Sequence, residues 1–226
     1  MPVVLITGAG RGIGLEFARQ YAEEGWTVLA GVRDPERAGD LFDIDGDVTV
    51  LQLDVTDPAA VVIMSERLAG IPIDLLINNA GVGNPSDLED GGIDYAAWIG
   101  VLQANTLGPV RVTEAFLPHL RESEHGKIVT ISSQMGSIGQ SSGRAIIYRS
   151  SKAAVNAAMR ALAMDHKGEG LSFAVVHPGW VKSGIGGAKA PLEPADSVAG
   201  MRQIISELDA DKSGRFWNYD GSEIPW

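Results

Sequence analysis

The sequence predicts a single doubly wound α/β domain, with a parallel sheet of about seven strands and helices on both faces. Two observations support this prediction. Short β-branched runs alternate along the chain with longer segments of helical period, which is the pattern of parallel strands joined by crossover helices. The strand-like runs are also almost continuously apolar, as expected for strands covered on both sides. Residues 1–226 contain no linker-like segment, so one domain is expected over the whole chain.

The predicted strands share a high content of Val, Ile, Leu and Thr, and Gly, Pro or Asp residues lie close to their ends. In chain order they are Val3–Thr7, Thr27–Val32, Val48–Leu53, Asp74–Asn78, Lys127–Ser132, Ser172–Val176 and Phe216–Tyr219.

The predicted helices are bounded by capping and stop signals. Asp57 and Pro58 suit the N-cap and first position of one helix, and Gly25 suits the stop of another. Pro109 lies inside the longest candidate, where a proline removes a backbone hydrogen bond, so a kink or an irregular turn is expected there. The expected helices are Ile13–Glu24, Pro58–Ala69, Tyr95–Leu120, Tyr148–His166 and Pro194–Leu208.

Charge and composition disfavour several classes of protein. The 226 residues carry a formal net charge of −11 and include no cysteine. A surface this acidic repels phosphate groups, so neither nucleic acid nor an anionic membrane is expected as a partner. Without cysteine there is no disulfide framework and no thiolate chemistry. No apolar stretch reaches the roughly 18 residues of a transmembrane helix, and no basic leader precedes the first strand, so a cytoplasmic location is expected.

A metal centre is not expected. The four histidines lack the spacing of a ligand pair and have no cysteine partners. The acidic group of Asp87, Glu89, Asp90 and Asp94 is expected to be a solvated loop and helix start. A serine hydrolase is disfavoured as well, because the chain has no G-x-S-x-G motif.

The turn after the first strand is rich in glycine and reads Thr7-Gly8-Ala9-Gly10-Arg11-Gly12-Ile13-Gly14. Glycine lets the backbone turn tightly and lets a diphosphate approach the N–H groups of the following helix. The common G-x-G-x-x-G spacing is not met, since Ile13 stands where the third glycine would be. The turn fits G-x-x-x-G-x-G instead. For this motif alone, a glycine-rich turn without a ligand is an open alternative.

Four further residues are candidates for chemistry. Tyr148 and Lys152 are spaced i, i+4 at the start of a predicted helix and share one face. An ammonium within about 4–6 Å lowers the pKa of a phenol, so the pair suits general acid catalysis. Ser133 ends a predicted strand, and Asn105 lies inside a predicted helix, where asparagine is disfavoured without a polar partner. Each residue alone also has an ordinary structural explanation.

Together these motifs resemble the short-chain dehydrogenase/reductase family. The likeness rests on the glycine turn, Asn78-Asn79-Ala80-Gly81, Asn105, Ser133, Tyr148-x-x-x-Lys152 and Pro178-Gly179, in that order. The segments Tyr148–Lys152, His177–Val181 and Asn218–Gly221, with Pro225-Trp226, are similar to the C-factor/sniffer-like carbonyl reductase branch. The resemblance implies a Rossmann-type fold and reversible hydride transfer between NADP(H) and a carbonyl compound or secondary alcohol.

The resemblance also implies a role for each site residue. Tyr148 would donate the proton, and Lys152 would lower its pKa and bind the nicotinamide ribose. Ser133 would polarise the carbonyl oxygen, and Asn105 would hold a water for proton relay. The implied cofactor-binding residues are Gly8, Arg11, Gly12, Ile13, Gly14, Arg33, Asp54, Val55, Asn79, Ala80, Gly81, Tyr148, Lys152, Pro178, Gly179, Val181 and Ser183.

The end of the second predicted strand indicates which cofactor is used. An NAD enzyme of this family carries an acidic residue there, which binds the ribose hydroxyls and repels a 2′-phosphate. Here the position is Val32, and Arg33 follows it. Arg11 is expected to face the same ribose, and two guanidiniums suit a phosphate, so NADP(H) is the expected cofactor. The open alternative is two exposed arginines, with Asp34 neutralising Arg33.

The substrate pocket is expected between the loops 134–147 and 183–195. Ser133 and Tyr148 are 15 positions apart, slightly more than is common in the family, so the first loop carries extra residues. Three glycines in the second loop indicate a mobile lid. An apolar carbonyl compound is favoured by the expected lining residues, although some of them could pack under the loops; they are Met135, Ile138, Trp180 and Ile185.

A homodimer, or a homotetramer built from it, is expected. The two long predicted helices, Tyr95–Leu120 and Tyr148–His166, carry apolar residues on more than one face. Each is therefore expected to pack against a second partner besides the sheet, and the family resemblance implies that these helices pair across a two-fold axis. Val101, Leu102, Val110 and Phe116 are examples in the first helix. The alternative function is a cofactor-binding signalling or regulatory protein with little turnover, against which the four candidate catalytic residues argue.

Overall fold

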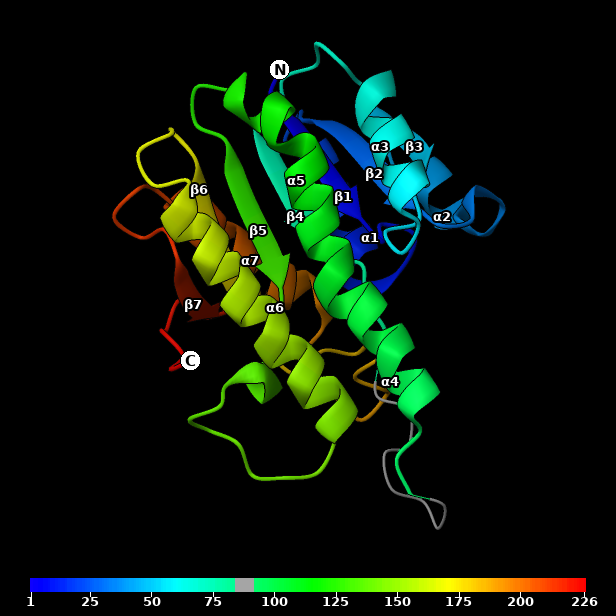
Figure 1. Ribbon diagram of the computed structural model, residues 1–226. Coiled ribbons are helices and arrows are strands. Elements are labelled where there is room, and N and C mark those ends of the chain that lie inside the picture. The colour runs from blue at the N-terminus through cyan, green and yellow to red at the C-terminus, as the bar shows by residue number, and fades with distance from the viewer. Residues whose placement is uncertain (84–91) are drawn as a thin grey trace.

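The computed structural model describes residues 1–83 and 92–226 and contains one seven-stranded sheet, with the order β3-β2-β1-β4-β5-β6-β7 (Figure 1). Every neighbouring pair of strands is parallel. The order reverses between β1 and β4, and doubly wound sheets bind ligands at such a switch point, beyond the carboxyl ends of the strands. The strands are β1 (Val3–Thr7), β2 (Thr27–Val32), β3 (Val48–Gln52), β4 (Leu75–Asn78), β5 (Lys127–Ile131), β6 (Ser172–His177) and β7 (Arg215–Asn218).

Helices cover both faces of the sheet, as predicted. In Figure 1, α3, α5 and α6 lie in front of the sheet and α1 and α7 behind it. The rear layer buries Phe17 and Met201 against the sheet, and the front layer buries Phe116. The helices are α1 (Gly12–Glu23), α2 (Gly39–Phe42), α3 (Pro58–Arg67), α4 (Tyr95–Leu102), α5 (Gly108–Arg121), α6 (Ile146–Asp165) and α7 (Pro194–Ser206).

Most predicted elements begin and end within two residues of the observed ones. Helix α6 begins two residues before Tyr148, directly after Ala145, which has a left-handed φ of 52°. Three short helices were not predicted, because none is long enough to show a helical period: α2, η1 (Pro35–Arg37) and η3 (Gln134–Gly136).

The helix predicted over Tyr95–Leu120 is helical throughout but not a regular α-helix. Between α4 and α5 lies a π-helical turn, η2 (Gln103–Leu107). The irregular turn expected near Pro109 is confirmed. Pro109 itself stands in the first turn of α5, directly after the π-helical turn. Such wide turns are frequent at functional sites, and this one carries Asn105.

The apolar residues that predicted an oligomer are only partly available to a second copy. Val101 and Phe116 are 4% and 0% exposed and pack inside the protomer, so that part of the reasoning was wrong. Ile99, Leu107 and Met164 are exposed on the same helices, and the oligomer stays a prediction that rests on them.

No helix in the described part of the chain is both long and apolar enough to cross a membrane. Asp87, Glu89 and Asp90 lie outside the described residues, so the expectation of a solvated acidic loop stays a prediction.

Candidate active site

The glycine-rich turn joins β1 to α1 and has a backbone geometry that favours glycine. Gly8 and Gly12 have φ angles of 67° and 56°, in the left-handed region that residues with a Cβ rarely adopt. A Cβ on Gly14 would lie 2.3 Å from the carbonyl oxygen of Gly8. The turn therefore depends on these three glycines, as the sequence predicted.

Residues after β4 hold this turn in place. The side-chain amide of Asn79 donates to the carbonyls of Thr7 (3.0 Å) and Gly8 (3.1 Å). In return, the hydroxyl oxygen of Thr7 accepts from the N–H groups of Asn79 (3.0 Å) and Ala80 (3.1 Å). The structure thus brings the predicted Asn79 and Ala80 to the glycine turn, across the switch point of the sheet.

The start of α1 suits an anion. Arg11 is the N-cap residue, and in the described structure no side chain caps this helix and no acidic residue lies in its first turn. The first N–H groups of a helix are positively polarised and have no partner within the helix. Beside a tight glycine turn they form a site that fits a diphosphate, so the residues present fit a dinucleotide cofactor.

The end of β2 offers positive charge and no carboxylate. Val32 is 4% exposed, and a Cβ on Gly10 would lie 3.3 Å from its side chain. Arg33 is exposed and forms no ion pair with any residue in 1–83 or 92–226. Asp34 pairs with Arg37 (3.3 Å) and caps η1. The alternative in which Asp34 neutralises Arg33 is therefore not observed.

The segment after β3 forms a fixed turn. One carboxylate oxygen of Asp54 accepts from the N–H (2.9 Å) and hydroxyl (2.7 Å) of Thr56. The carbonyl of Val55 accepts from Arg111 (2.6 Å). Asp54 and Val55 thus lie at the carboxyl edge of the sheet, where the family resemblance places the adenine.

Tyr148 and Lys152 lie one turn apart on α6, both nearly buried at 9% and 6% exposed. The ammonium of Lys152 is 5.8 Å from the centre of the Tyr148 ring and donates to the carbonyl of Ile131 (3.0 Å). Burial raises the pKa of Tyr148 to about 12, against a smaller lowering by the nearby Ser133 hydroxyl. Burial also lowers the pKa of Lys152 to about 8. The predicted lowering of the tyrosine pKa by Lys152 is not found in the protein alone: burial sets the direction of the shift, and the opposing contribution comes from Ser133.

Ser133 stands at the end of β5, where it can face both Tyr148 and a ligand. It is 8% exposed, and its hydroxyl oxygen accepts from the N–H of Met135 (3.1 Å). The hydroxyl also lies near enough to Tyr148 to lower the pKa of its phenol. The strand end and the first turn of α6 therefore bring together the predicted serine and tyrosine.

Asn105 is 1% exposed and uses its side-chain amide within the protein. Its oxygen accepts from the N–H of Val82 (2.8 Å), and its NH₂ group donates to the carbonyl of Val82 (3.0 Å) and the hydroxyl of Ser151 (3.1 Å). A Cβ on Gly81 would lie 3.1 Å from this oxygen and 3.8 Å from the ammonium of Lys152. Asn105 thus fixes the strand end beside Lys152, and its role in holding a water stays a prediction.

Asn156 is a buried polar residue of the site that sequence reasoning missed. Its oxygen accepts from the hydroxyl of Ser132 (2.5 Å), and its NH₂ group donates to the carbonyl of Gly136 (3.3 Å). It therefore supports the backbone on both sides of Ser133. Its spacing of four from Lys152 placed it on the same helix face, which was the signal available in the sequence.

The segment after β6 closes over the glycine turn. Gly179 has a φ of 82°, and Pro178 accepts a hydrogen bond from Ser197 (2.6 Å). Val181 is buried, while Ser183 accepts from the N–H of Gly186 (3.1 Å). A Cβ on Gly12 would meet the Ser183 side chain at 3.6 Å, so the two predicted cofactor segments face each other.

Three of the predicted pocket residues are largely exposed: Ile138 at 77%, Trp180 at 58% and Ile185 at 55%. The alternative in which they pack under their loops is therefore wrong for these three. Met135 is half-buried. The indole N–H of Trp180 donates to the carbonyl of Gly186 (2.8 Å), and a Cβ on Gly83 would meet Ile185 at 3.5 Å. These side chains stand at the carboxyl edge of the sheet, free to contact a ligand.

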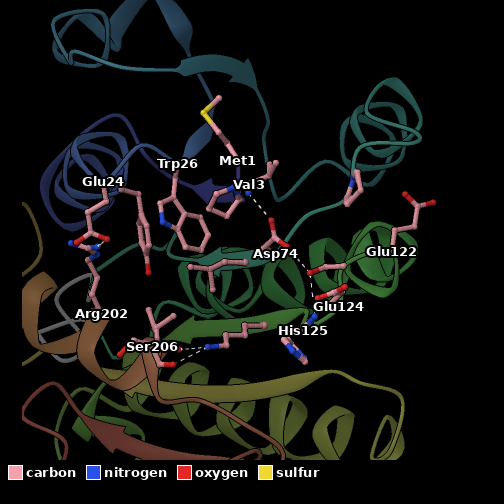
Figure 2. Close-up of a pocket in the computed structure, with 17 residues that line it drawn as sticks. Met1, Val3, Glu24, Trp26, Asp74, Glu122, Glu124, His125, Arg202 and Ser206 are labelled. Carbon is pink, nitrogen blue, oxygen red and sulfur yellow. Dashed lines mark hydrogen bonds and ion pairs between the residues drawn. The ribbon is translucent and has the colours of Figure 1, made fainter.

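The opposite edge of the sheet holds a cavity of about 590 Å³ (Figure 2). Two of its charged side chains bond to the backbone: Asp74 accepts from the N–H of Val3 (2.7 Å), and Lys127 donates to the carbonyl of Ile205 (2.7 Å). None of the predicted site residues lines it. In the part of the chain that the structure describes, no group of three His, Asp or Glu side chains could hold a metal ion.

The comparisons with known proteins agree with this geometry. Residues 2–193 match the family model described as short chain dehydrogenase. C-signal of Myxococcus xanthus is 44% identical over 156 residues, which are 69% of this chain and 93% of that protein. A crystal structure of NADPH-bound carbonyl reductase from chicken fatty liver superposes with a TM-score of 0.90 at 34% identity, covering 100% of both chains.

Carbonyl reductase Sniffer of D. melanogaster superposes with a TM-score of 0.92 at 30% identity, again over 100% of both chains. The likeness to C-signal and to Sniffer confirms the branch that the tail motifs indicated. The chain therefore belongs to the short-chain dehydrogenase/reductase family.

Proposed function

We propose that this protein is an NADPH-dependent carbonyl reductase in which Tyr148 is the general acid. The observation that carries the proposal is that Ser133, Tyr148 and Lys152 are all buried together, with Ser133 lowering the pKa of Tyr148 and the Lys152 ammonium 5.8 Å from the tyrosine ring. The three side chains meet at the carboxyl edge of the sheet, beside a glycine turn that fits a diphosphate. We infer that residues 1–226 act as one catalytic domain.

The raised pKa of Tyr148 suits the reductive direction. With a pKa of about 12 the phenol keeps its proton at neutral pH, so it is ready to donate. NADPH, when bound, supplies the hydride that goes to the carbonyl carbon. Ser133 donates a hydrogen bond to the carbonyl oxygen, and Tyr148 gives that oxygen its proton. Lys152, with a pKa of about 8, can pass a proton on to the phenolate that results.

The preference for NADPH rests on the end of β2. Val32 cannot accept a hydrogen bond from a ribose, and the exposed Arg33 has its charge available for a 2′-phosphate. Arg11 is exposed in the glycine turn and can reach the same phosphate. Two forked guanidiniums bind a phosphate with charge-assisted hydrogen bonds. The NADPH bound to the chicken carbonyl reductase supports this choice.

The substrate is proposed to be an apolar aldehyde or ketone, since Ile138, Trp180 and Ile185 present apolar surface at the site. A regulatory protein with little turnover is the second candidate, and the likeness to C-signal favours it. The two candidates differ in turnover, because a binding protein does not need a buried acid beside a lysine.

The test is a panel of aldehydes and ketones, followed by NADPH absorbance, with Tyr148→Phe as the decisive variant. Phenylalanine keeps the ring and removes the proton, so kcat should fall about 10²- to 10⁴-fold, while NADPH binding persists. Tyr95→Phe is the matched control, because Tyr95 is 68% exposed. Turnover by Tyr148→Phe near the wild-type rate would contradict the mechanism, and binding of NADPH without turnover on the whole panel would favour the regulatory protein.

A further inference from the structure

The loop between β5 and α6 leaves the site at Ser133 and returns to it at Tyr148. Residues 140–144 are all exposed, so this part of the loop has little buried apolar surface to fix its conformation. Ile138, on the same loop, is also mostly exposed. The shape of this pocket wall must therefore depend on hydrogen bonds.

The return of the loop is strained. Arg144 and Ala145 have φ angles of 59° and 52°, and two consecutive residues with a Cβ in the left-handed region are unfavourable on their own. Something outside these two residues must hold them in this conformation.

Arg149 supplies the restraint. Its Nε donates to the carbonyls of Gly143 (3.1 Å) and Arg144 (3.1 Å). One terminal nitrogen donates to the hydroxyl of Ser142 (3.1 Å), and the other to the carbonyl of Met135 (3.3 Å). The guanidinium thus joins the beginning of the loop to its end, with charge-assisted bonds to neutral acceptors.

The position of Arg149 on α6 separates the restraint of the loop from the proton transfer by Tyr148. It follows Tyr148 on α6, and neighbouring helical residues do not share a face, so the tyrosine meets Ser133 while the arginine meets the loop. A lysine could not replace it, because a single ammonium lacks the fork that reaches all four acceptors.

A second anchor holds the middle of the loop from the other side. The hydroxyl of Ser137 donates to the carbonyl of Pro225 (2.6 Å), and the N–H of Gly139 donates to the carbonyl of Trp226 (3.1 Å). The Trp226 ring packs on Phe216, with centroids 5.5 Å apart. Loss of Arg149 would therefore free the segment 140–145 without releasing Ser133.

We propose that Arg149 is a positioning residue that fixes the loop 134–145 as one wall of the substrate pocket and thereby sets which carbonyl compounds are accepted. The proposal rests on the carbonyl reductase function proposed above. It assigns Arg149 to substrate selection and leaves proton transfer to Tyr148.

Limited trypsin digestion tests the restraint without relying on activity. The bond after Arg144 is exposed, and its carbonyl is held by Arg149. Loss of about one charge-assisted hydrogen bond corresponds to a factor of about ten. Arg149→Met should therefore be cut after Arg144 about tenfold faster than wild type, and Arg149→Lys nearly as fast. Arg67→Met, which removes an exposed arginine from α3, is the control and should be cut at the wild-type rate.

Kinetics with NADPH then test selection, using a small aliphatic aldehyde and a bulky aromatic ketone as probes. In Arg149→Met the ratio of kcat/KM for the two probes should change about tenfold, mainly through KM, while kcat for the small aldehyde stays within about twofold of wild type. Unchanged cutting after Arg144, an unchanged ratio, or full rescue by Arg149→Lys would overturn the proposal. Absence of turnover by the wild type would instead overturn the proposed function, whatever the digestion shows.

Discussion

Replacing Lys152 by methionine should make the protein alone more stable while it removes activity. Burial lowers the pKa of Lys152 from 10.5 to about 8. That shift corresponds to about 3 kcal/mol of lost stability at neutral pH, where the buried group is charged. The variant also loses the hydrogen bond to the carbonyl of Ile131 (3.0 Å), which offsets about 1 kcal/mol of the stability gained by removing the buried charge. Methionine has a similar length and no charge, so a net gain of about 2 kcal/mol is expected.

The assay is thermal unfolding at pH 7 without cofactor. A gain of about 2 kcal/mol should raise the Tm by about 4–8 °C for a chain of this size. Lys167→Met is the matched control, since Lys167 is exposed just beyond the end of α6 and its removal should leave the Tm within about 1 °C, as for an ordinary surface change.

The pH dependence gives a second check. Below pH 8 the native wild type carries the buried ammonium. Between pH 8 and 10.5 native Lys152 has lost its proton while the unfolded chain keeps it, so the stability of the wild type rises with pH. The advantage of Lys152→Met should therefore shrink across this window. A variant less stable than wild type at pH 7, or an advantage that stays constant up to pH 10.5, would refute the reasoning.

Three further predictions concern the cofactor, the lid and the assembly. Arg33→Ala should raise the KM for NADPH about 10- to 100-fold and leave that for NADH nearly unchanged; an equal effect of Arg37→Ala, whose arginine pairs with Asp34, would contradict this. Hydrogen exchange in Ser183–Ala195 should slow when NADPH binds, and equal protection with and without NADPH would contradict a lid. Light scattering should give at least twice the 23.9 kDa of one chain, and a mass of one chain at micromolar concentration would count against the homodimer.

Much of the fold was predictable because alternation of apolar runs and helical segments is a local property of the chain. The glycine turn was equally visible, since three glycines there have no substitute. The π-helical turn could not be predicted, because a proline such as Pro109 indicates that a helix is irregular but not what form the irregularity takes. The site residues also came from local motifs, whereas Asn156 was missed because its partners, Ser132 and Gly136, lie at the end of another element.

Two properties of the site needed the folded structure. The pKa of Tyr148 depends on burial as well as on neighbouring charge, so the spacing to Lys152 alone predicted the wrong direction of shift. For the loop 134–145, the sequence indicated only that it is longer than is common in the family. Its shape comes from Arg149 and from the carbonyls of Pro225 and Trp226, and no periodicity reports such contacts.

The end of β5 and the inner face of α6 form one unit. Three successive residues at and just after the strand end face three successive turns of the helix: the carbonyl of Ile131 accepts from Lys152, the hydroxyl of Ser132 donates to Asn156, and Ser133 lies beside Tyr148. Polar groups on a buried helix face are unfavourable unless they are paired, so a shift of α6 by one residue would break every pair at once. The helix and strand can therefore keep the acid in place independently of the loop 134–145 that joins them.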